Sequence, residues 1–231
     1  MRNKYVRATD TTRSHGLRSY MLGVYQNMSL GLAITGAVAL AFYSITALHY
    51  LISPGFILGS VVLQLVLVLS IPTIIDRASL ITAHVLFWTY AALLGFNLSV
   101  LFFVYIAESI ASTFFISASA FAALSIYGYT TKRDLTNFGS FLYAGLNALV
   151  IAVVINMFVG GSVMSFAISM IAVPIFLGLT AYQTQAIASH YYKFANDEKM
   201  RDKASILGAL SLYLSFINIF IHLLRLIGDR K

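Results

Sequence analysis

The chain has 231 residues, of which 59% are hydrophobic and only 10% are charged. A soluble domain is typically about 45–50% apolar and about 25% charged, so this balance places the chain among integral membrane proteins. The formal charge is +7, yet the basic residues are scattered between apolar runs, which argues against nucleic-acid binding. Because the chain has no cysteine, disulfides, thiolate metal sites and cysteine nucleophiles are excluded.

The first 20 residues, MRNKYVRATDTTRSHGLRSY, are polar and basic. We interpret residues 1–20 as a cytoplasmic tail and residues 21–231 as a single membrane domain. The apolar run that follows is bilayer-length, unlike the short apolar core of a cleaved signal peptide. A mitochondrial transit peptide is the alternative, since the segment carries four arginines, but Asp10 and the shortness of the segment count against it.

Seven apolar runs are long enough to cross a bilayer, for which an α-helix needs about 20 residues. The short connections between them predict one compact bundle, so the expected fold is an all-α integral membrane protein. The expected spans are residues 24–48, 56–75, 81–105, 110–129, 138–159, 163–189 and 205–227.

The positive charges predict the orientation of the spans. Lysine and arginine precede the first span and follow the second, fourth and sixth spans, whereas the connections after the first, third and fifth contain neither. By the positive-inside rule the N-terminus is cytoplasmic. Arg225, Arg230 and Lys231 run against this bias, because seven crossings place them outside. Either that tail is tolerated there or one late segment is re-entrant, and we favour seven full spans.

Common catalytic patterns are missing from the sequence. HExxH, GxSxG and Walker A runs do not occur, and the five histidines fall in different elements without ligand spacing. Asp76 and Glu108 lie at span ends and the other six acids lie in loops or tails, so no acid is expected within the membrane. These patterns predict no enzymatic activity, no metal site and no cofactor.

The last expected span carries a polar stripe along one face. Its members are spaced four, three, four and three residues apart and are Ser211, Ser215, Asn218, His222 and Arg225. Such a face must turn toward protein or water, either for hydrogen bonding between helices or to line a cavity. We expect the arginine to reach the interface and the histidine to be structural. The histidine is nevertheless the only member whose charge changes near neutral pH.

The sixth expected span carries a second polar cluster, Gln183, Thr184 and Gln185, about two turns after Pro174, which is expected to kink the helix. Amides in lipid are costly unless they are hydrogen-bonded. The polar stripe of the last span is the natural partner for this cluster.

Three separated blocks resemble the Bax inhibitor family of membrane proteins. They are YGYTTKRDLTNFGSFL at 127–142, GLTAYQTQAI at 178–187 and GALSLYLSFINIFIHLLRL at 208–226. The resemblance implies a bundle of seven helices with the seventh surrounded by the other six. It also implies a pH-sensitive calcium leak channel; eukaryotic members suppress cell death, and some bacterial relatives bind a membrane protease.

In calcium-conducting members of this family, two aspartates on the sixth and seventh helices share a proton, and an arginine after the second helix latches onto them. By position, the aspartate sites fall on Gln183 and Ser215, and the arginine site falls on Arg77. Neither Gln nor Ser titrates near neutral pH. The resemblance therefore implies a pore with the acid pair lost, altered pH sensing and low calcium affinity, because calcium prefers carboxylate oxygens.

Two functions follow from the sequence. The first is a passive calcium or cation leak channel, and the alternative is a non-conducting regulator that binds a membrane protease or a stress or cell-death partner. In both cases the chain lies in the lipid bilayer. We expect a bacterial inner membrane, with mitochondrial or other organellar membranes left open.

Overall fold

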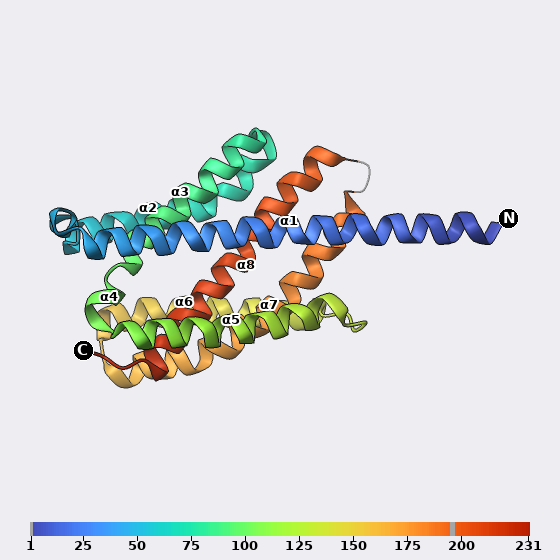
Figure 1. The fold of residues 1–231 in the computed structure, drawn as a ribbon. Helices are drawn as coiled ribbons and strands as arrows, with labels where there is room; N and C mark the ends of the chain where they lie inside the picture. Colours follow the sequence, from blue (N-terminus) through green and yellow to red (C-terminus); the bar gives the residue numbers. More distant parts are fainter. Residues whose placement is uncertain (1, 195–196) are drawn as a thin grey trace.

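The computed structural model describes the backbone of residues 2–194 and 197–231, and the side chains of residues 15–75, 78–194 and 197–231. Figure 1 shows a helical molecule. Its elements are α1 (Arg2–Ser44), the 3₁₀ helix η1 (Thr46–Leu51), α2 (Pro54–Arg77), α3 (Leu80–Leu98), α4 (Leu101–Val104), α5 (Ala107–Thr130), α6 (Thr136–Val159), α7 (Ser162–Lys193) and α8 (Glu198–Ile227).

Within the described residues, seven helices are long and apolar enough to cross a membrane, which confirms the predicted fold class. The observed spans are His15–Ser44, Pro54–Ile75, Leu80–Val104, Ala107–Thr130, Thr136–Val159, Ser162–Lys193 and Glu198–Ile227. Each predicted run falls on one of them, although the first ran four residues past the end of α1. Within the basic N-terminal segment, the backbone of residues 2–20 is helical and forms the first part of α1 (Figure 1).

Helix α8 is the core of the bundle. In its most apolar 18-residue stretch 72% of the residues are buried, against 11–33% in the other six spanning helices. It packs most extensively on α7 and also touches α1, α5, α3 and α2. In Figure 1 it crosses obliquely between a group formed by α1, α2 and α3 and a group formed by α5, α6 and α7. Helix α6 packs mainly on α7.

Burial explains why α8 carries so few charges along its middle. Its apolar face is enclosed by protein, and Tyr213, Leu212, Ile219 and Leu224 are fully buried. In contrast, α2, α5 and α6 expose many large apolar side chains, among them Leu69, Phe115 and Phe158. Such a surface is suited to lipid and would be unfavourable in water.

The C-terminus lies at the opposite end of the bundle from the start of α1 (Figure 1). Its last residues pair with the segment between α4 and α5: Ile106 N–H donates to the Asp229 carbonyl at 3.2 Å, and Lys231 N–H donates to the Val104 carbonyl at 3.0 Å. The Lys231 ammonium donates to the Phe102 carbonyl at 2.7 Å. These contacts hold the last residues at that end of the bundle, and both α7 and α8 are long and apolar enough to cross a membrane, as seven full spans require.

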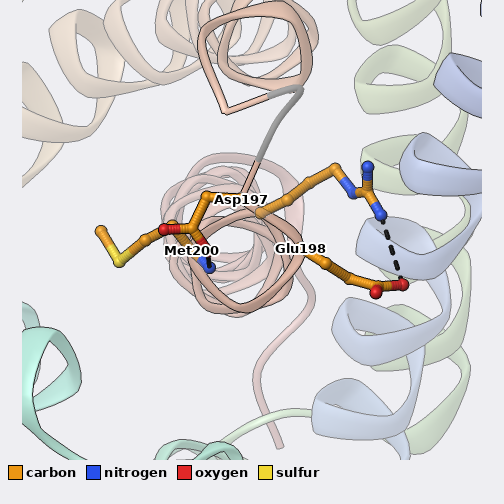
Figure 2. A network of polar contacts seen from close by, with 4 residues as sticks. Asp197, Glu198 and Met200 are labelled. Atoms are coloured by element: carbon orange, nitrogen blue, oxygen red, sulfur yellow. Dashed lines mark hydrogen bonds and ion pairs between the residues drawn. The ribbon is translucent and has the colours of Figure 1, made fainter.

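Helix α8 begins with a side-chain cap. The Asp197 carboxylate accepts a hydrogen bond from Met200 N–H at 3.0 Å, which satisfies one of the free amides of the first turn (Figure 2). Beside it, Glu198 forms an ion pair with Arg201 at 3.6 Å. This exposed pair adds little stability, whereas the cap fixes where the buried helix starts.

Candidate functional site

The centre of the α7–α8 interface holds a neutral hydrogen bond between the two positions singled out in the sequence. The Ser215 hydroxyl donates to the Gln183 side-chain oxygen at 2.8 Å. Ser215 is only 2% exposed and Gln183 is half-buried. Among the residues whose side chains are described, no Asp or Glu is buried, so none of them places a buried carboxylate beside the pair. The pair can therefore join the helices without gaining or losing a proton.

A cavity of about 330 Å³ runs from the α7–α8 connection to this pair. Gln183 and Ser211 line its inner part, and His190, Phe194 and Lys203 line it near the connection. The cavity is therefore lined by polar side chains of both α7 and α8, from the connection between the helices inward to Gln183. Ser215 is outside the lining, because its hydroxyl is directed to Gln183.

Beyond the pair, the next two residues of the polar stripe, Asn218 and His222, are also hydrogen-bonded. The Asn218 amide donates to the Leu214 carbonyl of its own helix at 2.8 Å. The His222 Nδ1 lies 3.1 Å from the Ser169 hydroxyl of α7, in a buried contact. The imidazole also stacks on Phe176, with ring centroids 6.2 Å apart. His222 is therefore hydrogen-bonded and packed against α7, and the structural role expected from the sequence stays a prediction.

The last member of the stripe leaves the core. Arg225 is exposed and lines a separate cavity at the C-terminal end of the bundle. The five stripe residues thus occupy different settings. Ser211 lines a cavity, Ser215 bonds to Gln183 of α7, and Asn218 bonds within α8. His222 makes a buried contact with α7, and Arg225 lies at the exposed end of the helix.

Thr184 points away from the pair toward α5. Its hydroxyl donates to the Thr180 carbonyl at 2.8 Å and lies 3.1 Å from the Ser125 hydroxyl. Ser125 is in turn 2.5 Å from the Tyr25 hydroxyl of α1. Successive residues of a helix project about 100° apart, so neighbours in sequence need not share a site. Thr184 belongs to a buried chain that links α1, α5 and α7.

Gln185 holds the connection between α5 and α6. Its amide donates to the Arg133 carbonyl at 2.8 Å, and its oxygen accepts from Leu135 N–H at 2.9 Å. In the same connection, hydrogen bonds from the hydroxyl and N–H of Thr136 lower the pKa of Asp134. Gln185 thus acts as a structural clamp on this connection, remote from the pair.

Glycine allows the helices around the pair to approach closely. A Cβ at Gly128 of α5 would overlap the Ala181 carbonyl of α7. This contact lies half a turn before Gln183 and sets how closely α5 packs on that helix. Only glycine leaves room for such backbone contact.

One predicted residue cannot be placed. Arg77 is the last residue of α2, but its side chain lies outside the described residues. Its predicted role as a latch therefore stays a prediction.

Several buried polar contacts were not singled out from the sequence. Thr35 of α1 lies 2.6 Å from the Tyr213 hydroxyl and donates to the Ala91 carbonyl of α3 at 3.0 Å. The sequence places Tyr213 on the apolar face of α8, and its ring is fully buried. A threonine inside an apolar run indicates a buried hydrogen bond. Its partners could not be identified from the sequence, because they are 56 and 178 residues away.

Comparison with known proteins agrees with this architecture. The family model described as "Inhibitor of apoptosis-promoting Bax1" matches residues 17–231. Protein RP147 of Rickettsia prowazekii is 44% identical over 223 residues, which cover 95% of this chain and 93% of that protein. The inner membrane protein YbhL of Escherichia coli is 42% identical over 219 residues, which cover 94% of each chain. A Caulobacter vibrioides protein is 38% identical over 232 residues, which cover 96% of this chain and 93% of the relative. The chain is a membrane protein that belongs to the Bax inhibitor family.

Proposed function

We propose that this protein is a passive cation leak channel, calcium being the ion that its family membership suggests, with a gate between α7 and α8 that does not titrate. The observation that supports this most directly is the Ser215–Gln183 hydrogen bond at the inner end of a cavity. The cavity offers an aqueous approach from the α7–α8 connection, and the bond joins the helices that would have to separate. The proposal assigns no enzymatic activity to the protein.

The gate differs from an acid pair in two respects. A neutral hydrogen bond is roughly half as strong as a charge-assisted one, so the closed state is held less firmly. An amide and a hydroxyl also attract a divalent cation less than carboxylates do. We expect a leak with low affinity for calcium and no pH dependence from this pair.

The membrane and orientation belong to the same proposal. YbhL is named an inner membrane protein, and this chain is similar to it over 94% of its length. We infer a bacterial inner membrane for this chain, with the N-terminus in the cytoplasm, as its distribution of lysine and arginine favours. The cavity that reaches Gln183 would then open toward the cytoplasm.

Calcium flux into proteoliposomes tests conduction. The purified chain should admit calcium faster than protein-free liposomes of the same lipid. If the flux depends steeply on pH and His222→Ala abolishes this pH dependence, the sensor is His222. No flux above the protein-free control at any pH would contradict the proposal.

A second candidate is a non-conducting regulator that binds a membrane protease or stress partner. It is favoured by the packing beyond the Gln183–Ser215 pair, where His222 contacts Ser169 and Phe176 and fills the space that a pore would need. It is also favoured by Arg225 and Arg230, whose positive charge at the far cavity repels cations. Purification in mild detergent should then recover a membrane protease with the protein, while the flux assay gives the protein-free rate.

A further inference from the structure

A second cavity, of about 840 Å³, lies at the end of the bundle that holds the C-terminus. Its wall combines Tyr105, Asn156 of α6, the Gly160–Gly161 turn, the first turns of α7 and two arginines, Arg225 and Arg230. It shares no lining residue with the cavity at Gln183.

Among the residues whose side chains are described, neither of the two arginines that line this cavity has a carboxylate partner. In the part of the chain whose side chains are described, the ion pair found joins Arg201 to Glu198, at the other end of α8. The nearby carboxylate of Asp229 is directed to the Ser109 hydroxyl, at 3.4 Å. The two guanidinium groups put two positive charges on one cavity wall, and an anion bound between them would offset their repulsion.

Arg230 is held in position before any ligand arrives. Its backbone forms an antiparallel bridge with Tyr105, and its guanidinium lies 5.9 Å from the centroid of that ring. The guanidinium therefore has a cation–π contact with Tyr105, which leaves its N–H donors for another partner. Arg225 projects from the last turn of α8 into the same cavity.

The N-terminus of α7 adds free N–H groups to this wall. Gly161 precedes Ser162 with φ of 125°, Gly160 has φ of 71°, and no side chain caps the helix. Two hydrogen bonds hold the Gly160–Gly161 turn in place. The Asn156 amide donates to the Ser165 hydroxyl, and that hydroxyl donates to the Gly161 carbonyl, both at 3.0 Å. The first-turn amides of a helix, together with its dipole, favour an anion.

We propose that this cavity binds a phosphate group through Arg225, Arg230 and the first turn of α7. Guanidinium groups bind phosphate oxygens in pairs, and helix N-termini add further donors. The group can be free phosphate or the headgroup of an acidic phospholipid. The exposed side chains of Val163 and Phe166 border the cavity and would lie along the glycerol and acyl part of a lipid.

The test uses the full-length protein and two probes, phosphatidylglycerol and inorganic phosphate. Native mass spectrometry measures phosphatidylglycerol retained from mixed phosphatidylglycerol–phosphatidylcholine micelles, and calorimetry measures phosphate binding. The variant Arg225→Gln/Arg230→Gln removes two charges from the cavity. The control Lys132→Gln/Arg133→Gln removes two exposed charges from the α5–α6 connection, where only the Arg133 backbone is used.

Binding of at least one probe should fall by about tenfold or more in the cavity variant and stay at the parental level in the control. Loss confined to phosphatidylglycerol identifies a lipid headgroup, and loss of inorganic phosphate identifies a free anion. Equal binding by both variants, or no binding of either probe by the parent, overturns the proposal. If the double variant does not fold, as judged by circular dichroism, Arg225→Gln alone serves, because the exposed Arg225 side chain makes no hydrogen bond within the described structure.

Discussion

The Ser215 hydroxyl of α8 and the Gln183 amide of α7 form a 2.8 Å hydrogen bond at the most extensive helix contact of the bundle. The partners are 32 residues apart in sequence and come from the two long helices that carry the polar positions. Both groups are neutral, so the bond stabilises the closed interface by the same amount at every physiological pH.

Removing the donor should loosen this interface modestly. In Ser215→Ala, the Gln183 oxygen loses its partner, and we expect a loss of about 1 kcal/mol in the free energy of unfolding. Denaturation in mixed detergent micelles measures it. The control Ser119→Ala removes an exposed hydroxyl that bonds only to the Phe115 carbonyl of its own helix and should be nearly neutral. An equal loss in both variants would contradict a special role for the pair.

The α5–α6 connection should depend on Gln185 and be independent of Gln183. Gln185→Ala removes two hydrogen bonds to the backbone of the connection, so faster amide exchange is expected at Leu135. Hydrogen–deuterium exchange in detergent measures this rate. Gln183→Ala should leave it unchanged, and faster exchange at Leu135 in both variants would show that the two amides act together.

Close packing of α5 on α7 should make Gly128 intolerant of a methyl group. Gly128→Ala places a Cβ against the Ala181 carbonyl, and we expect destabilisation of about 1–3 kcal/mol. Gly36→Ala is the matched control, because nothing lies within 4 Å of its added Cβ. Its better helix propensity should leave stability unchanged or raise it by up to about 1 kcal/mol. Thermal unfolding in detergent compares the two, and similar midpoints would contradict the close approach.

The buried hydroxyl of Thr35 should matter more than an exposed one. Thr35→Val keeps the shape but deprives the Tyr213 hydroxyl of its partner, at an expected cost of about 1–3 kcal/mol. Thr130→Val, at an exposed threonine that bonds to its own helix, should cost little. Chemical denaturation measures the free energy of unfolding of both variants. Equal losses would contradict a hydrogen bond that joins α1 to α8 through Thr35.

Much of the fold could be predicted because lipid imposes a simple rule on sequence. Seven bilayer-length apolar runs became seven helices. Of the polar stripe of α8, Ser215 and His222 are buried in the bundle, whereas Arg225 is exposed at its end. The pairing of Gln183 with Ser215 was predicted from the family resemblance. It could not be derived from composition or spacing alone.

The directions of neighbouring polar residues could not be predicted in the same way. Gln183, Thr184 and Gln185 are consecutive, yet they bond to α8, to α5 and to the α5–α6 connection, respectively. Their partners depend on how distant helices pack, which no local pattern contains. Tyr213 likewise lies on the face of α8 that the sequence predicts to be apolar, so the hydrogen bond between its hydroxyl and Thr35 of α1 could not be predicted.

The most direct test of the central claim compares calcium entry into proteoliposomes from about pH 6 to about pH 8 for the parent and for Gln183→Asp/Ser215→Asp. The account predicts that the rate of the parent stays nearly constant, whereas that of the variant becomes strongly pH-dependent, because two close carboxylates titrate as a coupled pair. Identical pH profiles for the two proteins would contradict the claim that these positions form the gate.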